Sequence, residues 1–265
     1  QAILDAGDND KVKAIVFRVD SPGGSPVAAD QIWNAIERVQ AKGKPVVVSM
    51  GSLAASGGYY VSAGADYIVA NRATITGSIG IFGGKFAIAG AFNKLGVTFD
   101  TISVGGEFAD AYGVDTFTPE QEATVKASLK RGYDRFLNIV AEGRGMTYDE
   151  VHEVARGRVW SGQDALDKGL VDELGTYMDA IEKAKELGGI DVDVTPRLVY
   201  YPHRPTGFEA LESLFGVSSE TVEAAAMLSR IAGDDRMQAL VEELSVMDAV
   251  NAGEAQAMGP RLRAN

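Results

Sequence analysis

Two apolar strand patterns joined by an amphipathic helix constrain the fold of this chain more than any other feature. Residues 12–19 (VKAIVFRV) form the first pattern, and the turn sequence DSPGG ends it. Residues 46–50 form the second. The helix predicted between them, over 26–42, has its apolar residues on one face: Ile32, Ala35, Ile36 and Val39. This order predicts a right-handed parallel crossover, and strands that are apolar throughout predict a parallel sheet core with flanking helices, an α/β fold.

Short strands and then helices are predicted along the rest of the chain. Residues 67–70 (YIVA) predict a strand, and the glycine- and threonine-rich segment that follows predicts further short strands to about residue 104. A last amphipathic helix covers about 176–187. Before it, helices are predicted to begin after Thr118, Thr147 and Ser161. Because the composition changes after this helix, we expect one folded domain over residues 1–193 and a helical C-terminal extension over residues 194–265.

The amino-acid composition excludes or disfavours several kinds of functional site. The chain of 265 residues has a formal net charge of −12, which does not indicate nucleic-acid binding. It has no cysteine, which excludes disulfides, thiolate nucleophiles and cysteine-ligated zinc. Its two histidines, His152 in a charged helical stretch and His203 in a proline-flanked loop, are typical of solvated side chains. We therefore expect no metal site and no cofactor.

The sequence predicts no membrane span. Its least polar stretch, residues 73–92, is interrupted by Thr74, Thr76, Lys85 and several glycines. The chain begins with Gln1 and enters a strand pattern by Val12 without a signal peptide. We expect it to be a piece of a longer protein, with any membrane anchor in the missing part.

Ser56 lies where the second strand pattern ends, in the sequence VVVSMGSLAASGGYY of residues 46–60, and only small residues surround its hydroxyl. A serine at a strand-to-helix turn is at the positive end of a helix dipole, among backbone N–H groups without partners. A reaction that forms an oxyanion needs such groups. These residues leave two interpretations open, a nucleophile and the ordinary N-terminal cap of a helix.

Two glycine-rich turns are predicted at the same edge of the sheet. The first, DSPGGS, contains Gly23 and Gly24, where a positive φ lets a backbone N–H point into a pocket, although an ordinary strand-to-helix turn has the same composition. The second, TITGSIGIFGG, contains Ser78. It lacks the G-x-G-x-x-G pattern and the following acidic residue of a dinucleotide-binding loop, so we exclude that interpretation.

Four segments occur in order along the chain: FRVDSPGGS, MGSLAASGGYYVSAGADYIVAN, TGSIGIFG and VWSGQDALDKGLVDELG. Over about residues 12–190 they resemble the signal peptide peptidase A family of serine peptidases, which includes protease IV. The resemblance implies a ClpP/crotonase-like fold and a membrane-associated enzyme that degrades cleaved signal peptides. It also implies the roles of site residues: Ser56 as nucleophile, Ser78 as hydrogen-bond partner of the general base, and an oxyanion hole at Gly23, Gly24 and Gly57.

The general base of that family is a lysine, and this chain departs from the family at that position. The matching stretch is GEFAD, where the lysine position falls on Ala109, and no lysine occurs between Lys94 and Lys126. A lysine base needs surroundings that lower its pKa, which Asp110 would oppose. Lys85 is the nearest candidate, but its position matches no base of the family.

Long members of the family carry the serine in a C-terminal half and the lysine in a homologous N-terminal half. The resemblance implies that this chain is the serine-bearing half and that the missing N-terminal half supplies the lysine. It further implies a homo-oligomer, a tetramer in the long members, and peptide substrates. The expected location is the bacterial cell envelope, associated with the inner membrane, with the peptidase domain outside the cytoplasm.

Two other function classes stay open. A crotonase-type acyl-CoA enzyme would use the same backbone donors with carboxylates in place of a nucleophile, but the sequence has no well-placed glutamate near Ser56. A catalytically incomplete domain would serve only assembly or substrate binding. The aromatic residues Tyr59, Tyr60, Phe82 and Phe86 are predicted to line an apolar substrate groove or, as is commoner for such side chains, to lie in the core.

Overall fold

The structure is a computed structural model, and it describes all residues except 101, 103–105, 192 and 203–265. The chain divides into two compact units, of which the first covers Ile3–Arg197 and the second begins at Leu198. His203 and most of the predicted helical extension lie outside the described residues. Residues 194–202, the described part of that extension, contain no helix.

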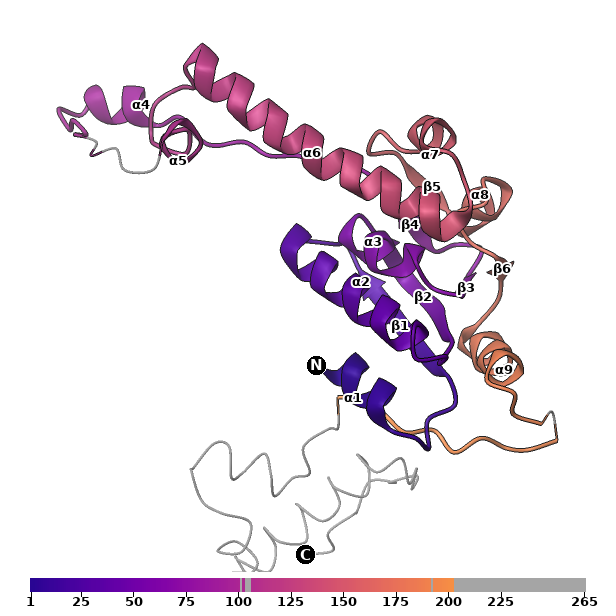
Figure 1. Ribbon diagram of the computed structural model, residues 1–265. Coiled ribbons are helices and arrows are strands. Elements are labelled where there is room, and N and C mark those ends of the chain that lie inside the picture. Colours follow the sequence, from indigo (N-terminus) through magenta and orange to yellow (C-terminus); the bar gives the residue numbers. More distant parts are fainter. Residues whose placement is uncertain (101, 103–105, 192, 203–265) are drawn as a thin grey trace, which may run out of the picture. The chain divides into compact units, whose positions relative to one another are not determined.

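A sheet forms the centre of the first unit, and β2 (Val46–Ala55) is its central strand (Figure 1). β1 (Ile15–Ser21) runs parallel to β2 along one edge. β3 (Tyr67–Ala70) and β4 (Ile75–Gly77) follow one another along the other edge, and both are parallel to β2. The parallel pairing of the first two predicted strands is therefore confirmed, and β2 continues five residues beyond the predicted strand end at Met50.

Two short strands complete the sheet in the described part of the chain. β6 (Glu173–Leu174) runs parallel to β3. β5 (Val159–Ser161) runs antiparallel to β4 and is the exception to the parallel order. Because β5 pairs with β4, it brings the chain near residue 158 beside the end of β4, where the second glycine-rich turn begins.

Helices begin at the residues that the capping sequences predict. At Thr118, Thr147 and Ser161 the side chain accepts a hydrogen bond from a backbone N–H of the first turn, and the third helical residue bonds back to the cap. The helices of the first unit not yet bounded are α1 (Ala2–Asp8), α2 (Pro26–Gln40), α3 (Gly57–Ala63), α6 (Pro119–Arg144), α7 (Tyr148–Val154), α8 (Gly162–Asp167) and α9 (Tyr177–Leu187).

The prediction of several short strands up to residue 104 is wrong beyond β4. The chain there forms two short helices, α4 (Ala89–Asn93) and α5 (Glu107–Asp110). Local hydrogen bonds such as Phe92 N–H to the Ile88 carbonyl satisfy the backbone, at 3.2 Å. The described part of this segment pairs with no strand of the sheet, although its apolar residues resemble a strand pattern.

Helices cover both faces of the sheet, as the apolar strands predict. Successive residues of β2 point to opposite faces. On one face Val48 belongs to a large buried cluster with residues of α3 and α6. On the other face Val47 packs with Ala180 and Ala184 of α9. This double coverage confirms the α/β class.

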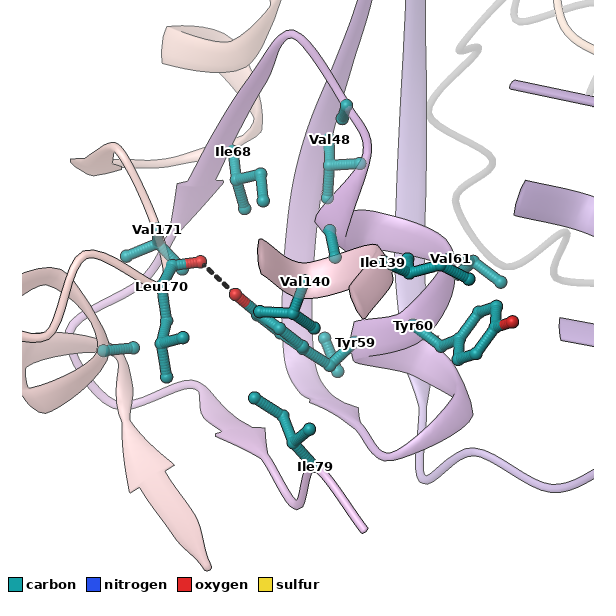
Figure 2. Packing of buried hydrophobic residues seen from close by; sticks show 14 of the residues in the cluster. Val48, Tyr59, Tyr60, Val61, Ile68, Ile79, Ile139, Val140, Leu170 and Val171 are labelled. Atoms are coloured by element: carbon teal, nitrogen blue, oxygen red, sulfur yellow. Dashed lines mark hydrogen bonds between the residues drawn. The ribbon is translucent and has the colours of Figure 1, made fainter. Parts of the chain in front are cut away.

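Tyr59 anchors α3 in the larger cluster. Its side chain is fully buried, and its hydroxyl donates a hydrogen bond of 2.8 Å to the Leu170 carbonyl (Figure 2). Beneath it, Arg144 binds both carboxylate oxygens of Asp172, at 3.0 and 2.6 Å. A buried phenol with a satisfied hydroxyl has one well-defined position, so it fixes the helix that begins directly after Ser56.

The aromatic residues proposed for a substrate groove divide into two groups. Tyr59 and Tyr60 lie in the core, where Tyr60 also donates to Asp30 at 2.7 Å. Phe82 and Phe86 are 98% and 90% exposed. The core interpretation is therefore confirmed for the two tyrosines, and the groove prediction is wrong for them.

Candidate active site

Ser56 occupies a strained turn between β2 and α3. Its φ of 52° and ψ of −119° are unusual for a residue with a side chain. Its hydroxyl makes no capping hydrogen bond to α3, so the interpretation as an ordinary N-cap is not confirmed. Strain of this kind at a strand-to-helix turn is a known device for exposing a nucleophile.

The first glycine turn lies directly against this serine. Gly23 has a φ of +100°, and a Cβ placed on it would lie 2.8 Å from the Ser56 Cβ and 2.5 Å from the Gly57 nitrogen. A Cβ on Gly57 would in turn lie 3.3 Å from the Gly24 nitrogen. A side chain at Gly23 would collide with these atoms, whereas one at Gly57 would need its neighbours to move by a few tenths of an ångström. The structure therefore brings together the two predicted elements of an oxyanion hole, which are far apart in the sequence.

The three predicted glycines differ in their N–H groups. The Gly23 N–H donates to the Ser21 hydroxyl at 3.1 Å. The N–H groups of Gly24 and Gly57 donate to no acceptor among the described residues. Gly23 thus shapes the turn, whereas Gly24 and Gly57 have backbone donors that remain available to a bound group.

Ser78 lies at the adjoining strand end. β4 pairs with the end of β2, and the Ser56 N–H donates to the Gly77 carbonyl at 2.9 Å. Ser78 itself has a φ of 49°, and its N–H donates to the Arg158 carbonyl at 2.7 Å. The two serines predicted to act together therefore lie on neighbouring backbones, each in a left-handed conformation.

The structure describes every lysine of the chain, and none of them is hydrogen-bonded to Ser56 or Ser78. Lys85 lies over the Phe117 ring, with Nζ 4.4 Å from its centroid. Ala109, the position of the family's lysine, is exposed on α5. Elsewhere Lys42, Lys44, Lys126, Lys130, Lys168, Lys183 and Lys185 bind other partners, and Lys11, Lys13 and Lys94 are exposed.

Other titratable side chains near the serine do not replace a lysine base. Burial raises the pKa of Tyr59, and burial together with the hydrogen bond to Asp30 raises the pKa of Tyr60 to about 12. Both phenols stay neutral at physiological pH. His152 on α7 has its Nδ1 3.0 Å from the hydroxyl of Tyr133 on α6. The described residues contain no cluster of three side chains able to hold a metal ion.

Two residues that the sequence reasoning missed support the glycine turn. Ser21 accepts from Gly23, as a serine two residues before a turn glycine often does. Asp20 accepts from the Leu53 N–H at 3.0 Å and covers Gly51, where a Cβ would lie 2.7 Å from its Cγ. Asp20 lies where the pairing register of β1 with β2 shifts, between Val19 and Ser21. The sequence does not reveal this shift.

A family comparison decides the classification of the chain. The model of peptidase family S49 matches residues 38–191. The chain belongs to peptidase family S49. The resemblance to signal peptide peptidase A and protease IV is therefore confirmed, since curated relatives in this family carry these names.

Several curated proteins are similar to this S49 chain. It is 43% identical to protease 4 of Salmonella typhi over 215 residues, which is 81% of the chain and 34% of that protein. It is 44% identical to protease 4 of Haemophilus influenzae over 182 residues, 69% of the chain and 29% of that protein. A putative signal peptide peptidase SppA of Enterococcus faecium is 35% identical over 198 residues, 74% of the chain and 56% of that protein. The chain thus spans about a third of the two protease 4 sequences.

Among solved structures, a ClpP1 mutant from Listeria monocytogenes is similar at a TM-score of 0.43 and 17% identity. The match covers 68% of this chain and 86% of ClpP1. The α/β class itself rests on the strand order and helix packing described above. In the described residues, no helix has the length and apolarity needed to cross a bilayer.

Proposed function

We propose that this S49 chain is the serine-bearing part of a serine endopeptidase. One observation carries the proposal: Ser56 is held at a φ of 52° against the Gly23–Gly24 turn, with the free N–H groups of Gly24 and Gly57 beside it. This arrangement suits attack on a carbonyl carbon and stabilisation of the oxyanion that results. The S49 family assignment favours a peptide bond as the group attacked.

In the proposed mechanism the Ser56 hydroxyl attacks the scissile carbonyl and passes its proton to a neutral lysine amine. The N–H groups of Gly24 and Gly57 stabilise the tetrahedral oxyanion. The lysine then protonates the leaving amine, and water releases the acyl group from Ser56 by the same sequence of steps. Ser78 donates or accepts a hydrogen bond that keeps the lysine amine near Ser56. The substrates we propose are cleaved signal peptides, at the bacterial inner membrane.

The lysine of this dyad comes from a second S49 domain. Every lysine of the chain has been placed, and each is exposed or bound away from Ser56. The chain spans only about a third of its protease 4 relatives, which leaves length for a homologous domain that supplies the base. On its own the chain would therefore bind substrate at an incomplete site. The same S49 membership disfavours the alternative of an acyl-CoA enzyme.

An exposed apolar segment provides a surface for that second domain. We call residues 82–99 the arm; it includes α4, and Figure 1 shows α4 and α5 near the N-terminal end of α6. Phe82, Phe86 and Leu95 in the arm are 98%, 90% and 78% exposed. The arm begins four residues after Ser78, so a domain seated on it could place a lysine beside the dyad. Large exposed apolar side chains in this number are typical of protein interfaces.

Replacing both Phe82 and Phe86 by serine is expected to weaken assembly on the order of 10²- to 10⁴-fold, because each phenylalanine would lose about 1.5–3 kcal/mol of burial at the interface. Sedimentation equilibrium of the isolated 265-residue chain mixed with the separately produced lysine-bearing domain measures this. The melting temperature of the isolated chain should stay unchanged, since both side chains are exposed. Met178→Ser, at a 61% exposed position of α9, is the control and should assemble normally. Normal assembly of the double variant would refute the arm as an interface.

Active-site labelling tests the proposed function. A fluorophosphonate probe should modify Ser56 in the full-length protein, as peptide mass spectrometry would show. The isolated 265-residue chain should react far more slowly, and addition of the lysine-bearing domain should restore the rate. Rapid labelling of the isolated chain would contradict the split dyad, and labelling at another serine would contradict the role of Ser56.

A further inference from the structure

The turn that contains Ser78 is held by the loop between α7 and β5. The Ser78 N–H donates to the Arg158 carbonyl at 2.7 Å, and the Gly157 N–H donates to the Ile79 carbonyl at 3.0 Å. The two backbones touch, since a Cβ on Gly80 would lie 3.0 Å from the Gly157 Cα. Any movement of the loop would therefore move Ser78.

This loop is itself strained at Arg156. Its φ of 60° makes it, with Ser56 and Ser78, one of three residues other than glycine with a positive φ among those the structure describes. An arginine in this conformation costs about 1–2 kcal/mol relative to the ordinary helical region. Its side chain pairs only with Glu153 at the surface, so the backbone must be held by another group.

Tyr133 on α6 is that group. Its hydroxyl accepts the Arg156 N–H at 3.2 Å and lies 3.0 Å from His152 Nδ1. Because the hydroxyl accepts from Arg156, its own proton is available to His152, whose Nδ1 then acts as the acceptor. The Tyr133 ring is half-buried against the main core cluster, which fixes the hydroxyl in space.

We propose that Tyr133 is a positioning residue for Ser78. The relay has three links: the Tyr133 hydroxyl holds the Arg156 N–H, the strained loop presents the Arg158 carbonyl, and that carbonyl binds the Ser78 N–H. The consequence for catalysis rests on the proposed function of Ser78 as the partner of the lysine base. The structural consequence, a stable conformation of Ser78, does not depend on it.

Tyr148 provides a matched control in the same cluster. Its ring stacks on His152 with centroids 6.4 Å apart and an interplanar angle of 5°. Its hydroxyl, however, donates to the Asp134 carboxylate at 2.9 Å and makes no hydrogen bond to the 155–158 loop. Removal of this hydroxyl changes the same histidine cluster but leaves the Arg156 N–H bound.

The test compares Tyr133→Phe with Tyr148→Phe by kinetics of the full-length protein and by amide exchange of the chain. Tyr133→Phe is expected to lower kcat about tenfold with KM changed less than twofold, the effect of one lost hydrogen bond on the reacting group. The Ser78 amide should exchange at least tenfold faster. Tyr148→Phe should leave kcat, KM and the Ser78 exchange rate at their original values.

Two results would overturn the proposal: an unchanged Ser78 exchange rate in Tyr133→Phe, or equal losses in both variants, which would indicate packing of α6 and α7 alone. Faster Ser78 exchange with an unchanged kcat would overturn the catalytic consequence and leave the positioning of Ser78 standing. Melting temperatures confirm that both variants are folded. Failure of the proposed function is seen separately, since Ser56→Ala would then remain active. The amide-exchange result would still decide whether Tyr133 holds Ser78.

Discussion

Replacing Ser56 by alanine is expected to lower kcat/KM for peptide hydrolysis on the order of 10⁶-fold in the full-length protein, the size of effect seen when a serine nucleophile is removed. The substitution removes the hydroxyl of the residue that lies against the Gly23–Gly24 turn, where the N–H groups of Gly24 and Gly57 have no acceptor among the described residues. No neighbouring group can substitute for it, because the adjacent tyrosines are buried and neutral. Peptide hydrolysis followed with a fluorogenic substrate gives the rate.

Ser52→Ala is the matched control for this prediction. Ser52 lies on the same strand, β2, but is exposed and outside the turn that holds Ser56. Its substitution should leave kcat/KM within a factor of about two, as is usual for surface positions. If Ser56→Ala retains full activity while the protein is folded, Ser56 is not the nucleophile, and the incomplete-domain alternative is favoured.

The elements with strong local patterns could be predicted from the sequence. The capping sequences at Thr118, Thr147 and Ser161 mark helix starts to the residue, because a side-chain hydrogen bond defines each one. The apolar runs of β1, β2 and β3 are equally clear, since consecutive apolar residues such as Val46, Val47 and Val48 are typical of strands covered on both faces. Local chemistry determines these features, and local sequence reveals them.

The segment after β4 could not be predicted in the same way. Its apolar residues resemble a strand pattern, yet Phe82 and Phe86 face solvent and only short helices form. Whether an apolar segment pairs as a strand depends on its packing in the whole fold and not on local sequence alone. If the arm serves a second domain, its apolar pattern reflects an interface outside this chain.

The family resemblance predicts the residues of the candidate site but not its hydrogen bonding. The family resemblance gave Gly23, Gly24, Gly57 and the two serines, and the structure brings their backbones together. It could not show that Gly23 donates to Ser21, because that bond depends on the local fold of the turn. Nor could it show that the Ser78 N–H donates to the carbonyl of Arg158, in a loop about 80 residues later in the sequence.

A single methyl group added at Gly23 is expected to lower kcat about 10²–10³-fold, the effect of losing an oxyanion donor. The Cβ of Gly23→Ala would lie 2.5 Å from the Gly57 nitrogen, 2.8 Å from the Ser56 Cβ and 2.9 Å from the Ala55 carbonyl oxygen. None of these atoms is the free end of a flexible side chain. The turn must therefore move away from Ser56, which separates the Gly24 N–H from the Gly57 N–H.

The control separates this collision from the conformational cost of alanine. Gly43→Ala places alanine at a similar φ, +78° against +100°, but its Cβ would meet no atom within 4 Å. It is expected to lower stability by about 1 kcal/mol without changing kcat. Kinetics and thermal melts of both variants give the comparison.

A kcat of Gly23→Ala within threefold of the unsubstituted protein would show that the Gly23–Gly24 turn does not form the oxyanion hole. Because Gly23 donates its own N–H to Ser21, a large loss would instead show that this glycine acts through the space it leaves for its neighbours.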